Sequence, residues 1–97
     1  MNINKKENGQ ELVVTLEGRL DTVSAPVFEQ EMSDLSGITS LVLDLKDLEY
    51  TSSAGLRVLL ALQKKMNQQG KMVLTNVCDS VREVFDITGF SDILTIQ

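Results

Sequence analysis

Three consecutive hydroxyl residues, Thr51, Ser52 and Ser53, are the side chains of this sequence best suited to a chemical modification. They follow an apolar, strand-like segment and directly precede Ala54 and Gly55, at the start of a strongly helical segment. Free backbone N–H groups and the helix dipole favour negative charge at such a start, so a phosphate ester there would be well placed. The simpler alternative, which the residues alone favour, is that one hydroxyl only caps the helix.

Several common kinds of catalytic and cofactor site are missing from the sequence. The chain has no histidine, which excludes a Ser-His or Cys-His nucleophile pair and an imidazole metal ligand. Neither a G-x-x-x-x-G-K-S/T loop nor a G-x-G-x-x-G turn is present. Cys78 is the only cysteine, which we expect to be a small buried or half-buried residue. We therefore expect no catalytic residues, no metal and no cofactor.

Length and charge limit the remaining functions. The 97 residues suit one domain over 1–97, with a core built from aliphatic side chains because only 4% of the residues are aromatic. A net charge of −5, without a run of Lys or Arg, argues against nucleic acid as a direct partner. We see no signal peptide and no apolar segment of membrane-spanning length, so we expect a cytoplasmic protein that does not bind a membrane.

The first half of the chain predicts a hairpin, a helix and an inner strand. Apolar residues alternate over 11–18, as one strand face requires, and a shorter strand at 3–6 precedes the turn signal Asn8-Gly9. A helix is expected over 24–36, opened by the Ser24 hydroxyl and Pro26 and ended by Gly37. The segment 40–45 is apolar on both faces, which predicts a central strand covered on both sides by helices.

The second half predicts two more helices and two strands. A helix over 54–69 ends at Gly70, and a strand follows over 71–76. A helix over 79–88, capped by Asp79 or Ser80 and ended by Gly89, precedes a short strand over 93–96. The order β-β-α-β-α-β-α-β predicts an α/β fold: a mixed four- to five-stranded sheet with about three main helices and right-handed parallel crossovers.

The sequence resembles a known family, the STAS-domain anti-sigma factor antagonists. The signature of this family is similar to the segment Thr51-Ser52-Ser53-Ala54-Gly55-Leu56-Arg57-Val58-Leu59 of this chain, which follows the strand ending in Asp44-Leu45. Two further segments resemble the family in the right order, Gly18-Arg19-Leu20-Asp21 and Val84-Phe85-Asp86-Ile87-Thr88-Gly89-Phe90. The resemblance covers essentially the whole chain and implies a single STAS-like domain.

The resemblance also implies a function. In this family the unphosphorylated antagonist binds an anti-sigma factor that is also a serine kinase using ATP and magnesium, which frees the sigma factor. Phosphorylation ends that binding, and a PP2C-type phosphatase restores it. The family serine lies two residues before the Gly-Leu pair, which is the position of Ser53 here. Many members have Asp where this chain has Ser52, so Ser52 and Thr51 stay alternative acceptors.

Five residues are predicted to bind the partner: Asp21, Ser52, Ser53, Gly55 and Arg57. The resemblance places Asp21 near the phosphorylated serine, although a simple turn residue is an equally good interpretation. Arg57 lies four residues after Ser53 on one helix face, where it can pair with a phosphate or remain solvated. Gly55 is best explained as a small residue that allows close packing.

Two other classes of function are compatible with parts of this sequence. A STAS scaffold subunit of a multiprotein assembly, such as a lipid-transport complex or a stress-signalling particle, would share the fold without sigma-factor regulation. Such a subunit need not depend on Ser53. A small hydrolase using Ser53 is disfavoured because the chain has no histidine.

Overall fold

Four strands and three helices follow one another along the chain. The computed structural model describes all residues from 1 to 97. The strands are β1 (Asn2–Asn8), β2 (Glu11–Leu20), β3 (Ser40–Thr51) and β4 (Lys71–Thr75). The helices are α1 (Ser24–Glu31), α2 (Ser53–Gln69) and α3 (Asp79–Thr88), and a short 3₁₀ turn follows at Phe90–Asp92.

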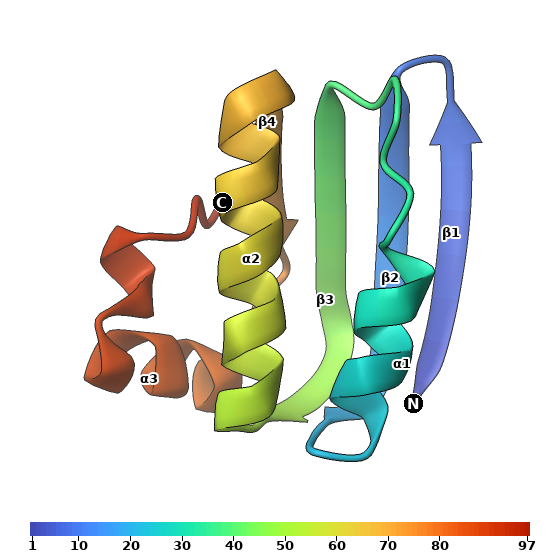
Figure 1. Ribbon diagram of the computed structural model, residues 1–97. Coiled ribbons are helices and arrows are strands. Elements are labelled where there is room, and N and C mark those ends of the chain that lie inside the picture. The colour runs from blue at the N-terminus through green and yellow to red at the C-terminus, as the bar shows by residue number, and fades with distance from the viewer.

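The strands form one mixed sheet in the order β1-β2-β3-β4 (Figure 1). β1 runs antiparallel to β2, and the hairpin between them places the positive φ, 63°, on Gly9. The other two strand pairs are parallel, and β3 lies between β2 and β4. These findings confirm the predicted mixed α/β sheet, with four strands, and the central place of the third strand.

Both crossover helices, α1 and α2, cover the same face of the sheet (Figure 1). Each crossover steps one strand further in the same direction, and connections of one hand then place their helices on one side. Leu43 points toward these helices and is fully buried, whereas its neighbour Val42 points the other way and is only half-buried. The prediction that helices cover both faces of this strand is therefore wrong.

The third helix, α3, packs at the edge of the sheet. β4 pairs only with residues 40–44 of β3, so the rest of β3 has an open edge on that side. There the Cys78 thiol donates a hydrogen bond to the Leu48 carbonyl, and the Ser80 hydroxyl donates one to the Glu49 carbonyl. Phe85 anchors the helix in the core. The helix thus supports the part of β3 that leads to the hydroxyl residues.

β3 continues to Thr51, well beyond the predicted end at residue 45. Two register shifts in its pairing with β2 allow the ladder to continue until Leu20 lies opposite Thr51. Leu48 and Thr51 are buried on the core face of this extension. The residues around them are mostly polar, so the sequence shows no clear strand pattern here. Only Ser52 lies between this long strand and α2.

Helix α1 ends at Glu31 and not near Gly37, so the prediction of a helix over 24–36 is too long. The carboxylate of Asp34 accepts a hydrogen bond from the N–H of Ser36, a local turn that competes with helix. The Gln69 side chain donates hydrogen bonds to two carbonyls of the same loop. Leu35 is buried from this loop, which explains its helix-like place in the apolar pattern.

The predictions for the helix ends and the last strand in the second half of the chain are confirmed in part. Gly70 and Gly89 end α2 and α3 as predicted; Gly89 has a φ of 81°, and a Cβ on Gly70 would collide with the Thr39 carbonyl. Neither Asp79 nor Ser80 caps α3, because the cap residue is Cys78 and has no side-chain cap bond. The predicted strand over 93–96 shrinks to one bridge between Ile96 and Leu74, since the chain first turns through the 3₁₀ segment.

Candidate functional site

The three consecutive hydroxyl residues lie in three different environments. Thr51 is the last residue of β3 and is buried, with its hydroxyl donating to the Ser52 carbonyl at 3.3 Å. Ser52 is half-buried and caps α2, because its Oγ accepts a hydrogen bond from the Gly55 N–H at 3.3 Å. Ser53 is the first residue of α2 and is exposed, and its hydroxyl makes no hydrogen bond within the chain. One serine, Ser52, therefore caps the helix, and its neighbour Ser53 has the free, exposed hydroxyl.

The start of α2 keeps its positive end available. Its first turn contains no acidic side chain, so nothing within the helix neutralises the partial positive charge of the N-terminal N–H groups. The Ser52 N–H donates to the Leu20 carbonyl at 2.8 Å, which ties the start of α2 to the end of β2. Because Asp21 follows Leu20 directly, this bond brings the turn at Asp21 beside Ser53.

Gly55 allows close packing under the helix start, as its sequence context predicts. A Cβ at this position would lie 2.5 Å from Thr51 Oγ1 and 2.7 Å from Leu20 Cγ, both closer than real Cβ contacts. Thr51 and Leu20 are themselves buried, so neither has free space to move into. Gly55 is buried as well and supports the site from below.

Asp21 caps helix α1. Its Oδ1 accepts hydrogen bonds from the backbone N–H groups of Val23 and Ser24, both at 3.0 Å. The Ser24 hydroxyl does not cap the helix N–H groups as predicted: it accepts a hydrogen bond from the Asp21 N–H at 2.9 Å, before the helix, and donates one to the Arg19 carbonyl at 2.7 Å. The bond from the Ser24 N–H is the main cause that holds the pKa of Asp21 below its usual value. These hydrogen bonds support the alternative interpretation of Asp21 as a residue that stabilises a turn.

Substitution of Asp21 by alanine is expected to lower the melting temperature by several degrees, because it removes the cap of α1. Since the carboxyl pKa is lower in the folded protein, its stabilising effect is present at neutral pH and is lost as the pH falls through that lowered value. Thermal melts at pH 7 and pH 3 measure both effects. Equal melting temperatures of the parent and Asp21→Ala at pH 7 would contradict this role.

Arg57 is exposed on α2, four residues after Ser53, and forms no salt bridge. It lines a hollow of about 220 Å³ between α1 and α2. The other residues of this hollow are Thr22, Ala25, Pro26, Glu29, Ala54 and Val58. The structure therefore brings Ser53, Asp21 and Arg57 to the same end of the molecule, where the starts of α1 and α2 meet.

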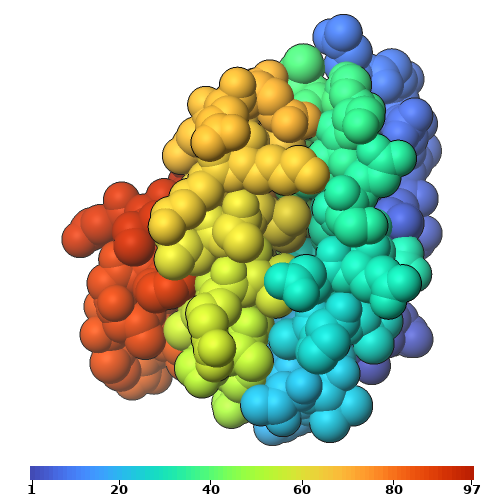
Figure 2. All heavy atoms as spheres, in the orientation of Figure 1, coloured from blue at the N-terminus to red at the C-terminus, as the bar shows by residue number.

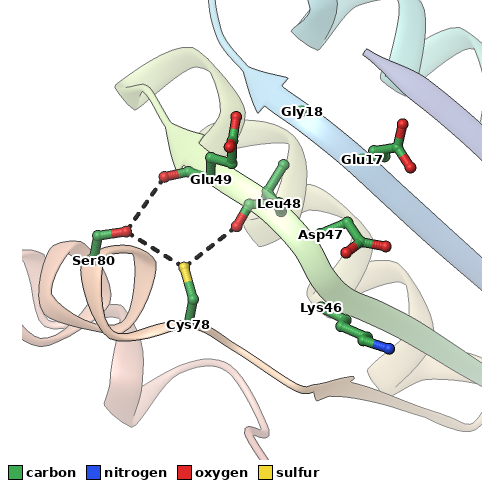
Figure 3. A pocket seen from close by; sticks show the side chains of 8 residues that line it. All are labelled: Glu17, Gly18, Lys46, Asp47, Leu48, Glu49, Cys78 and Ser80. Atoms are coloured by element: carbon green, nitrogen blue, oxygen red, sulfur yellow. Dashed lines mark hydrogen bonds between the residues drawn. The ribbon is translucent and has the colours of Figure 1, made fainter.

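A larger hollow of about 620 Å³ lies between β2, β3 and the start of α3 (Figure 3). Its polar lining includes Glu17, Asp47 and Glu49, none of which the sequence singled out. Cys78 also lines it and is half-buried, as expected. The Ser80 hydroxyl and then the Val81 N–H hold the pKa of the Cys78 thiol below its usual value. None of the predicted site residues lines this hollow.

The structure has no group of three His, Cys, Asp or Glu residues placed to hold a metal ion. None of its helices combines the length and apolar character that crossing a membrane requires.

Comparisons with known proteins identify the family of this chain. The STAS domain family matches residues 2–97. BtrV of Bordetella bronchiseptica is 41% identical over 88 residues, which are 88% of this chain and 76% of that protein. The anti-sigma-B factor antagonist of Bacillus subtilis is 34% identical over 99 residues, covering 100% of this chain and 91% of the relative.

Solved structures show the same fold. Unphosphorylated SpoIIAA, an anti-sigma factor antagonist, superposes with a TM-score of 0.85 at 19% identity, covering 99% of this chain and 88% of that one. SpoIIAA of Bacillus in the phosphorylated form gives a TM-score of 0.77 at 18% identity, with 99% and 91% covered. The family is one of non-enzymatic antagonists, as the sequence predicts. This chain therefore belongs to the STAS domain family and, within it, to the anti-sigma factor antagonists.

Proposed function

We propose that this antagonist is a partner-switching regulator controlled at Ser53. In its unphosphorylated form it binds an anti-sigma factor that is also a serine kinase, which releases the sigma factor for transcription. The kinase transfers the γ-phosphoryl group of ATP to the Ser53 hydroxyl, which loses its proton, and ADP leaves. The phosphorylated chain releases its partner, and a PP2C-type phosphatase hydrolyses the phosphate ester to restore binding.

The observation that carries this proposal is the exposure of Ser53 beside two occupied hydroxyls. Thr51 is buried, so a kinase cannot reach it without unfolding the end of β3. Ser52 uses its Oγ to cap α2, and phosphorylation there would disturb the cap. Ser53 alone combines access with a free hydroxyl at the uncompensated start of a helix.

The relatives support both halves of the switch. The Bacillus subtilis relative is named for its antagonism of the anti-sigma-B factor, which agrees with an anti-sigma factor as the partner. SpoIIAA has been solved in unphosphorylated and phosphorylated forms, so a fold of this kind accommodates a phosphate. Asp21 directly follows Leu20, whose carbonyl accepts the Ser52 N–H, and Arg57 lies four residues after Ser53 on α2, so both can provide charges to a partner that reaches Ser53. The hydrogen bonds of Asp21 to the start of α1 also fix the turn that presents it.

Phosphorylation by the source organism's anti-sigma factor kinase should depend on Ser53. With that purified kinase, Mg²⁺ and radiolabelled ATP, the Ser53→Ala variant should incorporate only background label, because it lacks the one exposed hydroxyl of the segment. The matched control is Ser52→Ala, which removes a cap and should keep most of the label. Normal labelling of Ser53→Ala would move the acceptor to Ser52 or Thr51.

A further inference from the structure

The second register shift between β2 and β3 leaves one residue of β3 without a partner. Leu48 and Tyr50 pair with two consecutive residues of β2, so Glu49 between them is an extra residue, which makes a β-bulge. Side chains alternate between the two faces of a sheet, and an extra residue therefore changes the face on which the following side chains lie. The bulge at Glu49 thus sets the orientation of the end of β3, where the hydroxyl residues begin.

Thr51 is buried as a consequence of this bulge. Leu48 and Thr51 both face the core although they are three positions apart, whereas core-facing residues of an unbroken strand lie two or four positions apart. Without the extra residue, Tyr50 would lie opposite Leu20 and face the core, and Thr51 would turn outward. The bulge therefore decides which hydroxyl is buried and which is exposed.

One contact on the outer face of the sheet fits the same register. The guanidinium carbon of Arg19 lies 4.2 Å from the centre of the Tyr50 ring, a cation–π contact between residues that the bulge places opposite each other. Both residues are exposed, and an exposed pair of this kind adds little stability by itself.

The start of α3 meets the bulge at the open edge of β3. Figure 2 shows α3 at the side of the molecule away from α1, with α2 between them. The Ser80 hydroxyl donates a hydrogen bond to the Glu49 carbonyl, and the Cys78 thiol donates one to the Leu48 carbonyl, both at 3.3 Å (Figure 3). Neighbouring carbonyls of a regular strand point to opposite edges, so the approach of both to one helix is a mark of the bulge. β4 pairs only with residues 40–44, so α3 takes the place of a strand at this edge.

We propose that the side chains of Ser80 and Cys78 form a clamp that holds the bulge at Glu49. The clamp keeps Thr51 buried and thereby leaves Ser53 as the hydroxyl that a kinase reaches. Both members of the clamp are positioning residues: they act through the register of β3 and form no hydrogen bond with the three hydroxyl residues. The choice of acceptor rests on the proposed function, whereas the hold on the bulge does not.

Hydrogen exchange tests the hold on the bulge. The double variant Cys78→Ala/Ser80→Ala removes both donors without adding charge. We expect its backbone amides over 48–52 to exchange at least about tenfold faster than those of the parent, because two hydrogen bonds no longer oppose local opening. Exchange in the middle of α2 should not change. Mass spectrometry or NMR measures both regions.

Two further variants separate the clamp from a general disturbance of α3. Cys78→Ser/Ser80→Thr keeps a donor at each position and should restore the parent's exchange over 48–52. Asp79→Ala is the matched control, because Asp79 lies in the first turn of α3, between the two members of the clamp, and its removal takes no hydrogen bond from β3. It should leave exchange over 48–52 at the parent's rate.

Phosphopeptide mapping tests the choice of acceptor. After incubation with the source organism's anti-sigma factor kinase, Mg²⁺ and ATP, the parent should carry phosphate on Ser53 alone. The Cys78→Ala/Ser80→Ala variant should carry about a tenth or more of its phosphate on Thr51, because the end of β3 can slip by one residue. A variant that had only lost stability would change its rate of labelling but not the labelled residue.

Each outcome decides for or against the clamp. Unchanged exchange over 48–52 in the double alanine variant, equally fast exchange in Asp79→Ala, or phosphate confined to Ser53 in the double alanine variant overturns it. A parent that takes no phosphate at Ser53 contradicts the proposed function instead, and the exchange rates then still show whether the clamp holds the bulge.

Discussion

Stoichiometric phosphorylation of Ser53 is expected to weaken binding to the anti-sigma factor by about two to three orders of magnitude while the domain stays folded. A phosphoserine brings about −1.5 to −2 charges, which the uncompensated start of α2 tolerates in the free protein. In the complex the same charge must be desolvated against a surface suited to a neutral hydroxyl. Asp21 adds repulsion, because its carboxylate is negatively charged at neutral pH. Each loss of about 1.4 kcal/mol weakens affinity tenfold.

The parent, its phosphorylated form and two variants at Ser53 together measure this effect. Titration calorimetry should give the parent and Ser53→Ala similar Kd values, because alanine keeps the small neutral surface. Ser53→Asp should bind poorly, since one carboxylate reproduces only part of the phosphate charge, and its circular dichroism spectrum should match the parent's. Undiminished binding by fully phosphorylated protein would contradict the switch and would instead suit a scaffold subunit that does not depend on the serine.

Much of the fold was predictable because its signals are local. Alternating Leu12, Val14 and Leu16 predicted β2, and Gly70 and Gly89 correctly marked two helix ends. The element order then limited the fold to a mixed sheet with parallel crossovers, which the structure confirms. The strand and the two helix ends each depend on residues within a few positions of one another.

The errors concern features that depend on distant contacts. β3 reaches Thr51 because it can pair with β2 past two register shifts, and no local pattern announces that pairing. The true end of α1 depends on the Asp34 turn and on Gln69, which contacts the loop from a distant helix. The prediction that helices cover both faces of β3 was wrong because the apolar pattern of 40–45 indicates burial. It does not indicate on which face of the sheet each helix packs.

The site was predictable in its residues but not in their roles. Three hydroxyls in a row drew attention to the segment, yet only the fold shows that Thr51 is buried, Ser52 caps and Ser53 is exposed. Asp21 carried two interpretations of equal weight until its hydrogen bonds to the start of α1 were seen. Such roles follow from depth and orientation, which a linear sequence does not encode at a single position.

Replacement of Gly55 by alanine is expected to destabilise the domain by about 1–3 kcal/mol, because the added methyl group overpacks a closed site. This sign is the reverse of the usual one, since glycine inside a helix normally costs roughly 0.5–1 kcal/mol relative to alanine. The new Cβ would lie 2.5 Å from Thr51 Oγ1 and 2.7 Å from Leu20 Cγ. For a domain of this size the melting temperature should fall by about 10 °C, measured by circular dichroism.

A double-mutant cycle shows whether this cost comes from the predicted collision. Thr51→Ala removes the Oγ1 that the new methyl group meets, so Gly55→Ala should cost less in that background than in the parent. The control is Ser53→Ala, two residues before Gly55 at an exposed position. It should change the melting temperature by no more than about 3 °C. The collision also pushes on Leu20, whose carbonyl holds the Ser52 N–H, so the kinase should phosphorylate Gly55→Ala more slowly than the parent. A stabilised Gly55→Ala with normal phosphorylation would show that the helix start has room that the structure denies it.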